Sequence, residues 1–327
     1  MTASPMVETG STERRRLVRL LPIPWPSDDR PGTIEGNVRL ARRLVEAVEP
    51  GAVDIACFPE GFLYHGVPAG TVHERVARDL DDLVKLFGSL ARDLGAWLFV
   101  PMVGPDGGAL RSLVVALDRD GAVRGRYAKL HPWPSSPGLT SLELGVVPGS
   151  SADAVSTEFG AIGIQTCFDV NWTRGWDELR RQGCTLVLFP SDYPGGFALR
   201  VRAWQVAAPI LASVLRGPSR LIDIDGDVVA RISADEHPTV LALNLNRCLV
   251  HLDHAWKELA ALDASDPALT IRRLEDDNIV LVEGPPDGPP VEELLGAVGI
   301  RPLNEYLDRA RVAIEGRELL AATADDE

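Results

Sequence analysis

Cysteine is scarce in this sequence: the 327 residues include four, and none belongs to a Cys-x-x-Cys pair. Cysteines so few and so widely spaced exclude a disulfide framework and a cysteine-ligated zinc site. His251 and His254 have the spacing of two metal ligands on a helix, but two solvated histidines on a surface helix explain the pair more simply. We therefore expect no metal, no cofactor and a reducing, cytoplasmic location.

Positive charge and long apolar runs are also lacking. The 33 Lys and Arg residues face 47 Asp and Glu, which gives a net charge of −14 and a pI of about 4.9. An acidic chain repels phosphate, so the sequence predicts no nucleic-acid partner and no membrane partner. The longest apolar run, Val206 to Leu215, contains Pro209 and is shorter than the ~18 residues of a transmembrane helix. Arginines at 14–16 precede an apolar patch, but Arg19 and several prolines interrupt it before a signal peptide can form.

The signature motifs of several enzyme classes are missing as well. The sequence contains no Gly-x-Ser-x-Gly elbow, no Gly-x-x-x-x-Gly-Lys phosphate loop, no Gly-x-Gly-x-x-Gly dinucleotide fingerprint and no His-Glu-x-x-His zinc motif. Any catalytic chemistry must rest on residues outside these patterns.

Short apolar segments alternate with helical patterns from Leu17 onward, which is typical of an α/β fold. The helices expected from apolar spacing are 34–48, 72–94, 174–182 and 198–208. Asp118 to Gly121 predicts the turn of a hairpin. The alternation favours two sheets sandwiched between helix layers. The expected strands are 17–21, 53–58, 97–101, 112–117, 123–127, 161–166, 185–189, 210–215, 219–224 and 239–245.

The composition divides the chain into three parts. Residues 1 to 15 are polar and without periodicity, which predicts a disordered tail. Residues 16–247 carry the α/β pattern. Residues 248–327 are more acidic, with helix-like stretches at 252–262 and 303–314 around a Pro- and Gly-rich linker at 284–290. We expect this last part to be an extension that packs on the core or on a neighbouring subunit.

Two candidate catalytic residues each follow a predicted strand. Glu60 ends a Phe-Pro-Glu sequence, where the aromatic neighbours Phe62 and Tyr64 would raise its pKa and suit it as a general base. Lys129 follows the hairpin and is one of three lysines beside 30 arginines. Its compact ammonium suits the stabilisation of an oxyanion. Taken singly, a solvated loop carboxylate and a surface lysine are the more ordinary interpretations.

The third candidate, Cys167, lies between a predicted strand and a helix, where backbone N–H groups favour a thiolate. A single cysteine is more often an inert small hydrophobe, which is our interpretation of Cys57, Cys184 and Cys248. Together, however, a carboxylate base, a cation and a thiol form a complete set for acyl transfer.

These three motifs, in this order, resemble those of the nitrilase or carbon–nitrogen hydrolase superfamily. Phe58-Pro-Glu60 is similar to its glutamate motif, and Tyr127-Ala-Lys129-Leu-His131 to its lysine motif. Gly163-Ile-Gln-Thr-Cys167-Phe-Asp169 is similar to its cysteine motif. The matching stretches cover about residues 16 to 247.

The resemblance implies a fold, an assembly and a mechanism. The fold is a four-layer αββα sandwich, which associates into a homodimer or a larger homo-oligomer. In the mechanism, Glu60 deprotonates Cys167, and the thiolate attacks an amide carbonyl or a nitrile carbon. Lys129 and a backbone N–H near Phe168 stabilise the tetrahedral intermediate, and water cleaves the thioester. Glu143 matches a second family glutamate that orients the lysine or the water, although a plain loop carboxylate competes with this role.

The substrate is expected to be a small amide, carbamoyl compound or nitrile. Phe168-Asp169 stands where nitrilases have Trp-Glu, which favours an amidase-like or carbamoyl-hydrolase-like enzyme. Transfer to an amine acceptor, nitrile hydrolysis and a non-catalytic scaffold are the alternatives, in that order. The residues expected to line the pocket are Tyr64, His65, Trp133, Phe168, Asn171, Trp172, Ser191 and Tyr193.

Overall fold

The computed structural model describes residues 15–26, 31–233, 237–253, 255–274 and 278–316. The predicted N-terminal tail, apart from Arg15, lies outside these residues. His254, the second histidine of the His251 and His254 pair, also lies outside them. Arg15 contacts Asp54 in an ion pair of 3.4 Å. No helix in the described part of the chain combines the length and the apolar character needed to cross a membrane.

The first of two six-stranded sheets has the strand order β12-β1-β2-β3-β4-β5. β1, β2 and β3 run parallel, β3, β4 and β5 form an antiparallel meander, and β12 is antiparallel to β1. The strands are β1 Leu17–Pro22, β2 Ile55–Cys57, β3 Trp97–Asp106, β4 Ala109–Leu117, β5 Val123–Ala128 and β12 Leu241–Asn244.

The second sheet repeats this plan in the order β11-β10-β9-β8-β7-β6. Its centre, β7, β8 and β9, is parallel, and its outer strands are antiparallel. The strands are β6 Val155–Thr157, β7 Gly160–Ile164, β8 Leu186–Ser191, β9 Ile210–Val214, β10 Ser219–Ile222 and β11 Val228–Ile232.

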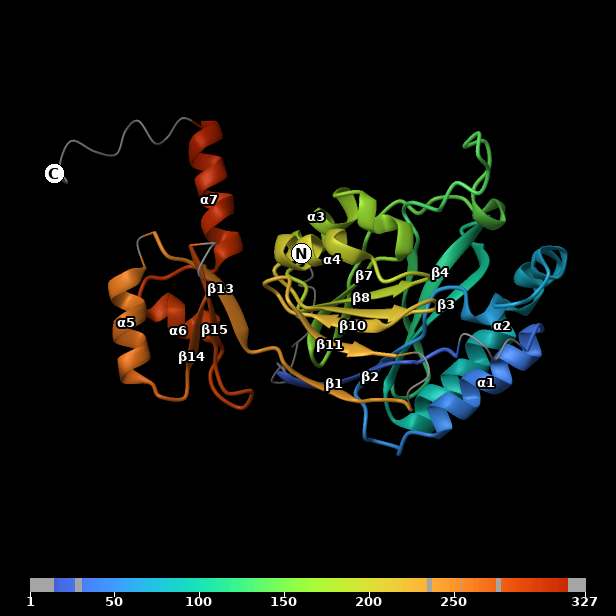
Figure 1. The fold of residues 1–327 in the computed structure, drawn as a ribbon, viewed down its shortest axis with the longest axis horizontal. Coiled ribbons are helices and arrows are strands. Elements are labelled where there is room, and N and C mark those ends of the chain that lie inside the picture. The colour runs from blue at the N-terminus through green and yellow to red at the C-terminus, as the bar shows by residue number, and fades with distance from the viewer. Residues whose placement is uncertain (1–14, 27–30, 234–236, 254, 275–277, 317–327) are drawn as a thin grey trace, which may run out of the picture.

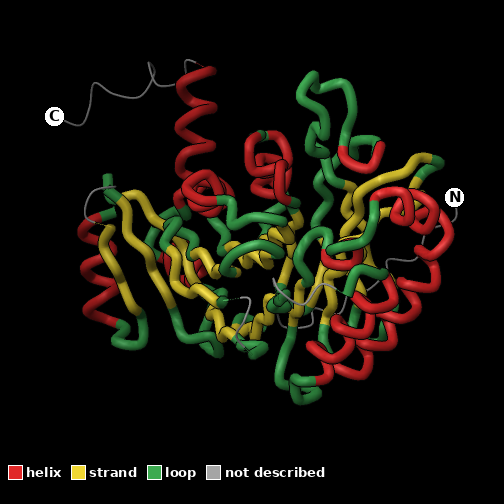
Figure 2. The backbone as a smooth tube through the Cα atoms, turned by 45° about the vertical axis from the view of Figure 1, so that its right-hand side comes forward, coloured by secondary structure: helices red, strands yellow, loops and turns green. Residues whose placement is uncertain are grey.

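Helices cover the outer face of each sheet (Figures 1 and 2). α1 (Ile34–Glu46) and α2 (Ala69–Leu94) cover the first sheet, and α3 (Arg174–Arg181) and α4 (Gly196–Val206) cover the second. The layer order is helix, sheet, sheet, helix, so the predicted αββα sandwich is confirmed.

In the first sheet, successive apolar side chains alternate between the two faces, so each face packs against another layer. In β3, Trp97 and Phe99 belong to the core between the sheets, whereas Leu98 and Val100 belong to the core under α1 and α2. Successive side chains of a strand point to opposite faces. A strand with covers on both faces is therefore continuously apolar, as this one is.

Residues beyond the sandwich form a further unit with its own apolar core. Three antiparallel strands, β13 (Arg247–His251), β15 (Ile279–Glu283) and β14 (Thr270–Leu274), pack with the helices α5 (Trp256–Ser265) and α6 (Val291–Ala297). α7 (Leu303–Gly316) follows and rises beside α3 (Figure 1). Ion pairs, such as that of Arg180 with Asp308 at 3.0 Å, join this unit to the sandwich.

The predicted strands did not include those of this unit or two edge strands of the sandwich, although β13 and β15 are buried apolar runs. β14 reads Thr-Ile-Arg-Arg-Leu and is largely exposed, so it carries no apolar run. β6 has three residues and β11 is half-exposed. Such strands form through pairing with a neighbour, which a local pattern does not record.

The predicted hairpin between β4 and β5 is confirmed, and its turn docks on a helix. Gly121, in the left-handed region at φ 77°, lies in the turn. A Cβ added to Gly88 of α2 would stand 2.6 Å from the Gly121 carbonyl oxygen. Only a glycine at position 88 allows α2 to approach the turn this closely.

We predict that Gly88→Ala lowers the free energy of unfolding by about 2 kcal/mol, because the methyl group forces the hairpin away from α2. Gly70→Ala on the same helix is the control, since an added Cβ there meets nothing within 4 Å, and the higher helix propensity of alanine should leave stability equal or slightly raised. Urea unfolding of both variants measures the difference. A stabilised Gly88→Ala protein would refute the close contact.

Candidate active site

The three motif residues follow strands that end at the same edge of the sandwich. Glu60 lies just beyond β2, Lys129 directly follows β5, and Cys167 begins the short helix η3 (Cys167–Asn171) after β7. Cys167 has φ 47°, in the left-handed region. A non-glycine residue in this region is strained, and such strain is held where the surrounding structure fixes the residue.

Lys129 is at the centre of the site, with a side chain that is 1% exposed. Its Nζ donates to Glu60 Oε1 at 2.7 Å and to Glu143 Oε1 at 2.6 Å. Burial by itself would lower the pKa of Lys129, but the charges of Glu60 and Glu143 outweigh it and raise the pKa above its usual value. The lysine therefore stays a cation. An ammonium group has three N–H donors, so one remains for a bound oxygen.

Burial raises the pKa of Glu60; Lys129 opposes this effect and the charge of Glu143 adds to it. The pKa of Glu60 is thus shifted in the direction that the sequence predicted. Burial, followed by the charge of Glu60, also raises the pKa of Cys167. The prediction that the strand-end position favours a thiolate is therefore wrong for the resting site. Cys167 rests as a thiol that is hydrogen-bonded to Glu60.

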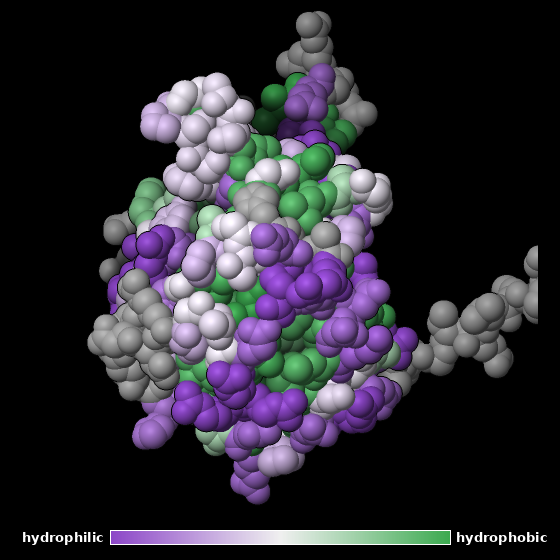
Figure 3. Space-filling model, turned by 90° about the vertical axis from the view of Figure 1, so that its right-hand side faces the viewer, coloured by the Kyte–Doolittle hydropathy of each residue, from purple (hydrophilic) through white to green (hydrophobic). Residues whose placement is uncertain are grey.

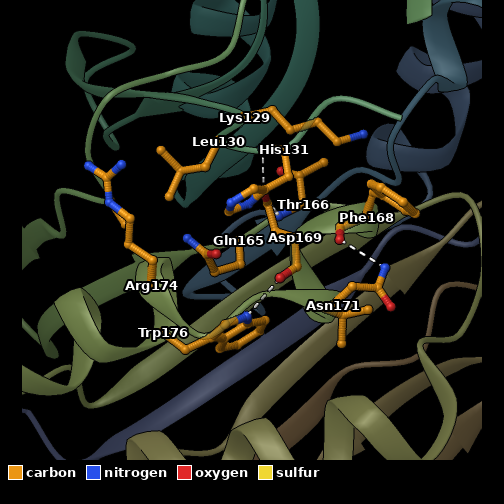
Figure 4. Close-up of polar contacts among 12 residues, drawn as sticks. Lys129, Leu130, His131, Gln165, Thr166, Phe168, Asp169, Asn171, Arg174 and Trp176 are labelled. Atoms are coloured by element: carbon orange, nitrogen blue, oxygen red, sulfur yellow. Dashed lines mark hydrogen bonds and ion pairs between the residues drawn. The ribbon is translucent and has the colours of Figure 1, made fainter. Parts of the chain in front are cut away.

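Asp169 ties the lysine segment to the cysteine segment (Figure 4). Its buried carboxylate accepts hydrogen bonds from the Tyr127 hydroxyl at 2.6 Å, the His131 backbone N–H at 2.8 Å and the Thr166 backbone N–H at 2.9 Å. The His131 ring also contacts it, at 2.9 Å from Nδ1. A buried carboxylate with this many partners fixes the relative positions of the elements that provide them.

A cavity of about 420 Å³ opens beside the two glutamates. Lys129 and Cys167 are not among its lining residues, but both contact Glu60, which is. Cys167 is 8% exposed. The volume is within the range of ~300–1,000 Å³ that is usual for small-molecule sites. The lining residues are Glu60, Gly61, Tyr64, Pro101, Met102, Val103, Ser112, Trp133, Glu143, Leu144, Val146, Asp192, Leu215 and Arg216.

Two of the predicted pocket residues, Tyr64 and Trp133, line this cavity. The hydroxyl of Tyr64 accepts from the Val103 N–H at 3.0 Å and lies 3.4 Å from the Val103 carbonyl oxygen. Trp133 is half-exposed at the rim.

Four other predicted residues form an aromatic cluster outside the cavity lining. Phe168 contacts Trp172, with ring centroids 4.9 Å apart, and Trp172 also stacks on His131. Asn171 donates to the Phe168 carbonyl oxygen at 3.0 Å and is hydrogen-bonded to Tyr193. Phe168 directly follows Cys167 in the sequence, so this cluster borders Cys167.

The last two predicted pocket residues serve the scaffold. Ser191 is fully buried and its hydroxyl accepts from the Tyr193 N–H at 3.1 Å. His65 accepts a hydrogen bond from Trp25 Nε1 at 3.0 Å and does not line the cavity.

Sequence reasoning missed Asp192 and Arg216, which form an ion pair in the cavity lining. The Asp192 backbone N–H also donates to Cys167. Asp192 follows the apolar strand β8, and Arg216 follows the apolar strand β9. This position just beyond a strand is the sequence signal that could have identified them as site residues. Within the described ranges, no group of three or more His, Cys, Asp or Glu side chains is placed to hold a metal ion.

Fold and site together define an αββα-sandwich enzyme of the nitrilase type. The chain belongs to the carbon–nitrogen hydrolase family, whose model matches residues 17–248.

Relatives of known name are distant. The chain is 23% identical over 175 residues to the deaminated glutathione amidase of Dictyostelium discoideum, which covers 49% of this chain and 59% of that protein. It is 25% identical over 226 residues to the nitrilase and fragile histidine triad fusion protein NitFhit of Caenorhabditis elegans, which covers 61% and 51%. The chain therefore spans between half and three fifths of the length of these two relatives.

Solved structures share the fold at low identity. Nit3 of Saccharomyces cerevisiae, a member of branch 10 of the nitrilase superfamily, has a TM-score of 0.59 and 15% identity, covering 72% of this chain and 92% of that chain. An amidase from Nesterenkonia sp. has a TM-score of 0.57 and 19% identity, covering 71% and 90%.

We predict that Glu143→Gln moves the acid limb of the pH profile of kcat/KM to lower pH. We expect Glu60 to be the general base, which must be ionised, so its raised pKa should place the acid limb of the native protein above the ordinary glutamate value of 4.5. Removing the charge of Glu143 removes one cause of that rise. The matched control is Glu46→Gln, which neutralises an exposed carboxylate on α1. An acid limb that stays in place or moves upward contradicts the assignment.

Proposed function

We propose that the protein is an amidase that hydrolyses small amides through a thioester on Cys167. The observation that carries the proposal is the buried Lys129, held by Glu60 and Glu143 beside a thiol that is hydrogen-bonded to Glu60. It joins a base, an oxyanion-stabilising cation and a nucleophile in one cluster. A mutant of the Nesterenkonia amidase carries the acetamide moiety of fluoroacetamide covalently at its active-site cysteine. That cysteine forms a covalent bond to carbon, which supports a nucleophilic role for Cys167 here.

In the first half-reaction the proton of the Cys167 thiol passes to Glu60, and Sγ forms a bond to the amide carbon. The oxygen gains a negative charge, which the free N–H of Lys129 and the Phe168 backbone N–H stabilise. The C–N bond then breaks as Glu60 returns the proton to nitrogen. Ammonia or an amine leaves, and the acyl group remains as a thioester.

In the second half-reaction Glu60 takes a proton from water, and the water oxygen attacks the thioester carbon. The C–S bond breaks, the proton returns to Cys167, and the carboxylic acid leaves. Amide and water become acid and ammonia, and the enzyme is unchanged. Because Glu60 is both acid and base, its raised pKa serves both halves.

Cys167→Ala should reduce ammonia release from simple amides by at least ~10³-fold, since no other group can form the acyl intermediate. The control is Cys184→Ala, which removes a buried thiol away from the cluster. Purified native protein and both variants are assayed with the same amides, and mass spectrometry of rapidly quenched native enzyme detects the acyl adduct. Equal activity of Cys167→Ala and native protein would exclude the thioester mechanism.

We also propose a homodimer, or a larger homo-oligomer, that forms through the outer face of α4. Phe197, Val201 and Trp204 lie at helical spacing on this face, with exposed fractions of 76%, 41% and 39%. An exposed apolar stripe of this kind marks an interaction surface. α4 also supports the nucleophile segment, since Arg202 Nε donates to the Val170 carbonyl oxygen at 3.0 Å.

Val201→Glu should shift the protein toward monomer, because it places a charge in the centre of the stripe. Val229→Glu on β11 substitutes another exposed valine and should leave the assembly unchanged. Light scattering after size-exclusion chromatography measures the mass of each variant. A dimer that persists in Val201→Glu at micromolar concentration refutes this interface.

Two further assignments complete the proposal. Residues 16–247 form the hydrolase domain, and residues 248–327 form an extension that packs on it, which the contact of Arg16 with the Gly288 carbonyl oxygen supports.

All four cysteines are free, which supports a cytoplasmic location.

A further inference from the structure

Apolar residues form most of the cavity wall beyond the two glutamates. Pro101, Met102 and Val103 contribute from β3, and Leu144, Val146 and Leu215 contribute from two loops. Val103 and Val146 also belong to a small buried apolar cluster behind the cavity, so this wall is part of the packed interior. Figure 3 shows this end of the sandwich, toward which β1 runs in Figure 1, with apolar residues exposed among hydrophilic ones.

The hydroxyl of Tyr64 adds little polarity to this wall, because the backbone of Val103 already engages it. Ser112 supplies a second hydroxyl to the lining. Apart from the indole N–H of Trp133, the remaining polar side chains of the lining are charged, so the charges decide which substrates the cavity accepts.

Each cation at the cavity is already paired with a carboxylate. Arg216 is the one cation among the described residues that line the cavity, and it forms an ion pair with Asp192. Lys129, beneath the cavity, contacts both Glu60 and Glu143. Three carboxylates thus face two cations. A further carboxylate on the substrate would meet net negative charge and no unpaired cation.

The backbone keeps the Asp192–Arg216 pair in place. The Arg216 N–H donates to the Asp192 carbonyl oxygen and the Leu215 N–H to the Ser191 carbonyl oxygen, both at 2.9 Å. These bonds extend the pairing of β8 with β9 to the residues that bear the two charges. A substrate carboxylate must therefore compete with a counterion that the fold itself provides.

We infer that the cavity selects uncharged amides with an apolar acyl chain and discriminates against amides that carry a carboxylate. The inference rests on the proposed amidase function. At ~30 Å³ for each water-sized group, the cavity volume of about 420 Å³ has room for a substrate of roughly fourteen non-hydrogen atoms. Asp192 is the specificity-determining residue, because its charge neutralises the one cation that a substrate carboxylate could use.

The test compares kcat/KM of the purified full chain for acetamide, butyramide, hexanamide and adipamate, the hexanamide analogue with a terminal carboxylate. Burial of each methylene should raise kcat/KM by up to ~4-fold. Hexanamide should exceed adipamate by ~100-fold or more, because a buried unpaired charge is strongly disfavoured. Asp192→Asn should lower the ratio of kcat/KM for hexanamide to that for adipamate about tenfold, because it frees Arg216 to pair with the substrate carboxylate. Glu305→Gln, which neutralises an exposed ion-pair carboxylate on α7, should leave the ratio unchanged.

Met102→Phe tests whether the acyl chain of the substrate lies against this wall of the cavity. A bulkier side chain there should reduce activity on hexanamide more than on acetamide. If this variant does not fold, the chain-length series of the native enzyme decides the point. Adipamate hydrolysed as fast as hexanamide, or a ratio unaffected by Asp192→Asn, overturns the inference and leaves the amidase function standing. Absence of activity on every amide overturns the proposed function itself.

Discussion

The contact on which this structure depends is the buried ammonium of Lys129 between the carboxylates of Glu60 and Glu143. A buried lysine without partners would lose its charge or destabilise the fold, because desolvation costs several kcal/mol. The two carboxylates offset that cost and keep the cation. They also hold together three segments, since Glu60 is 69 residues and Glu143 is 14 residues from Lys129 along the chain. The site therefore has its charge and its geometry from the same contact.

Asp169 provides the second constraint. Its hydrogen bonds to Tyr127 and His131 fix the segment that carries Lys129, and its bond to Thr166 fixes the residue before Cys167. Trp176 closes the network from α3 by donating to the Asp169 carbonyl oxygen at 3.0 Å. This support lets Cys167 keep its left-handed backbone conformation. Strain at the nucleophile and rigidity behind it are thus two parts of one arrangement.

Each of the two sheets contributes to the site through the carboxyl ends of its parallel strands. The first sheet provides Glu60, and the second provides Cys167, Asp192 and Arg216. The core between the sheets contains residues of both, so it sets the distance between Glu60 and Cys167. A substitution there would alter the geometry of the site without touching either side chain.

The sequence by itself determined the helices α1 to α4 of the sandwich, most of its strands and the identities of Glu60, Lys129, Glu143 and Cys167 as candidates, whereas α6 was not predicted. It did so because apolar periodicity is a local property and because the motif residues follow recognisable strands. Only the tertiary structure decided that Cys167 rests as a thiol, since burial and the charge of Glu60 come from contacts across the sandwich. The cavity wall and the Asp192–Arg216 pair were also beyond the sequence, because they arise where loops from separate strands meet. In the C-terminal unit, the exposed strand β14 forms by pairing with β15 and carries no apolar pattern of its own. Its partners β13 and β15 are buried apolar runs that the sequence prediction left out.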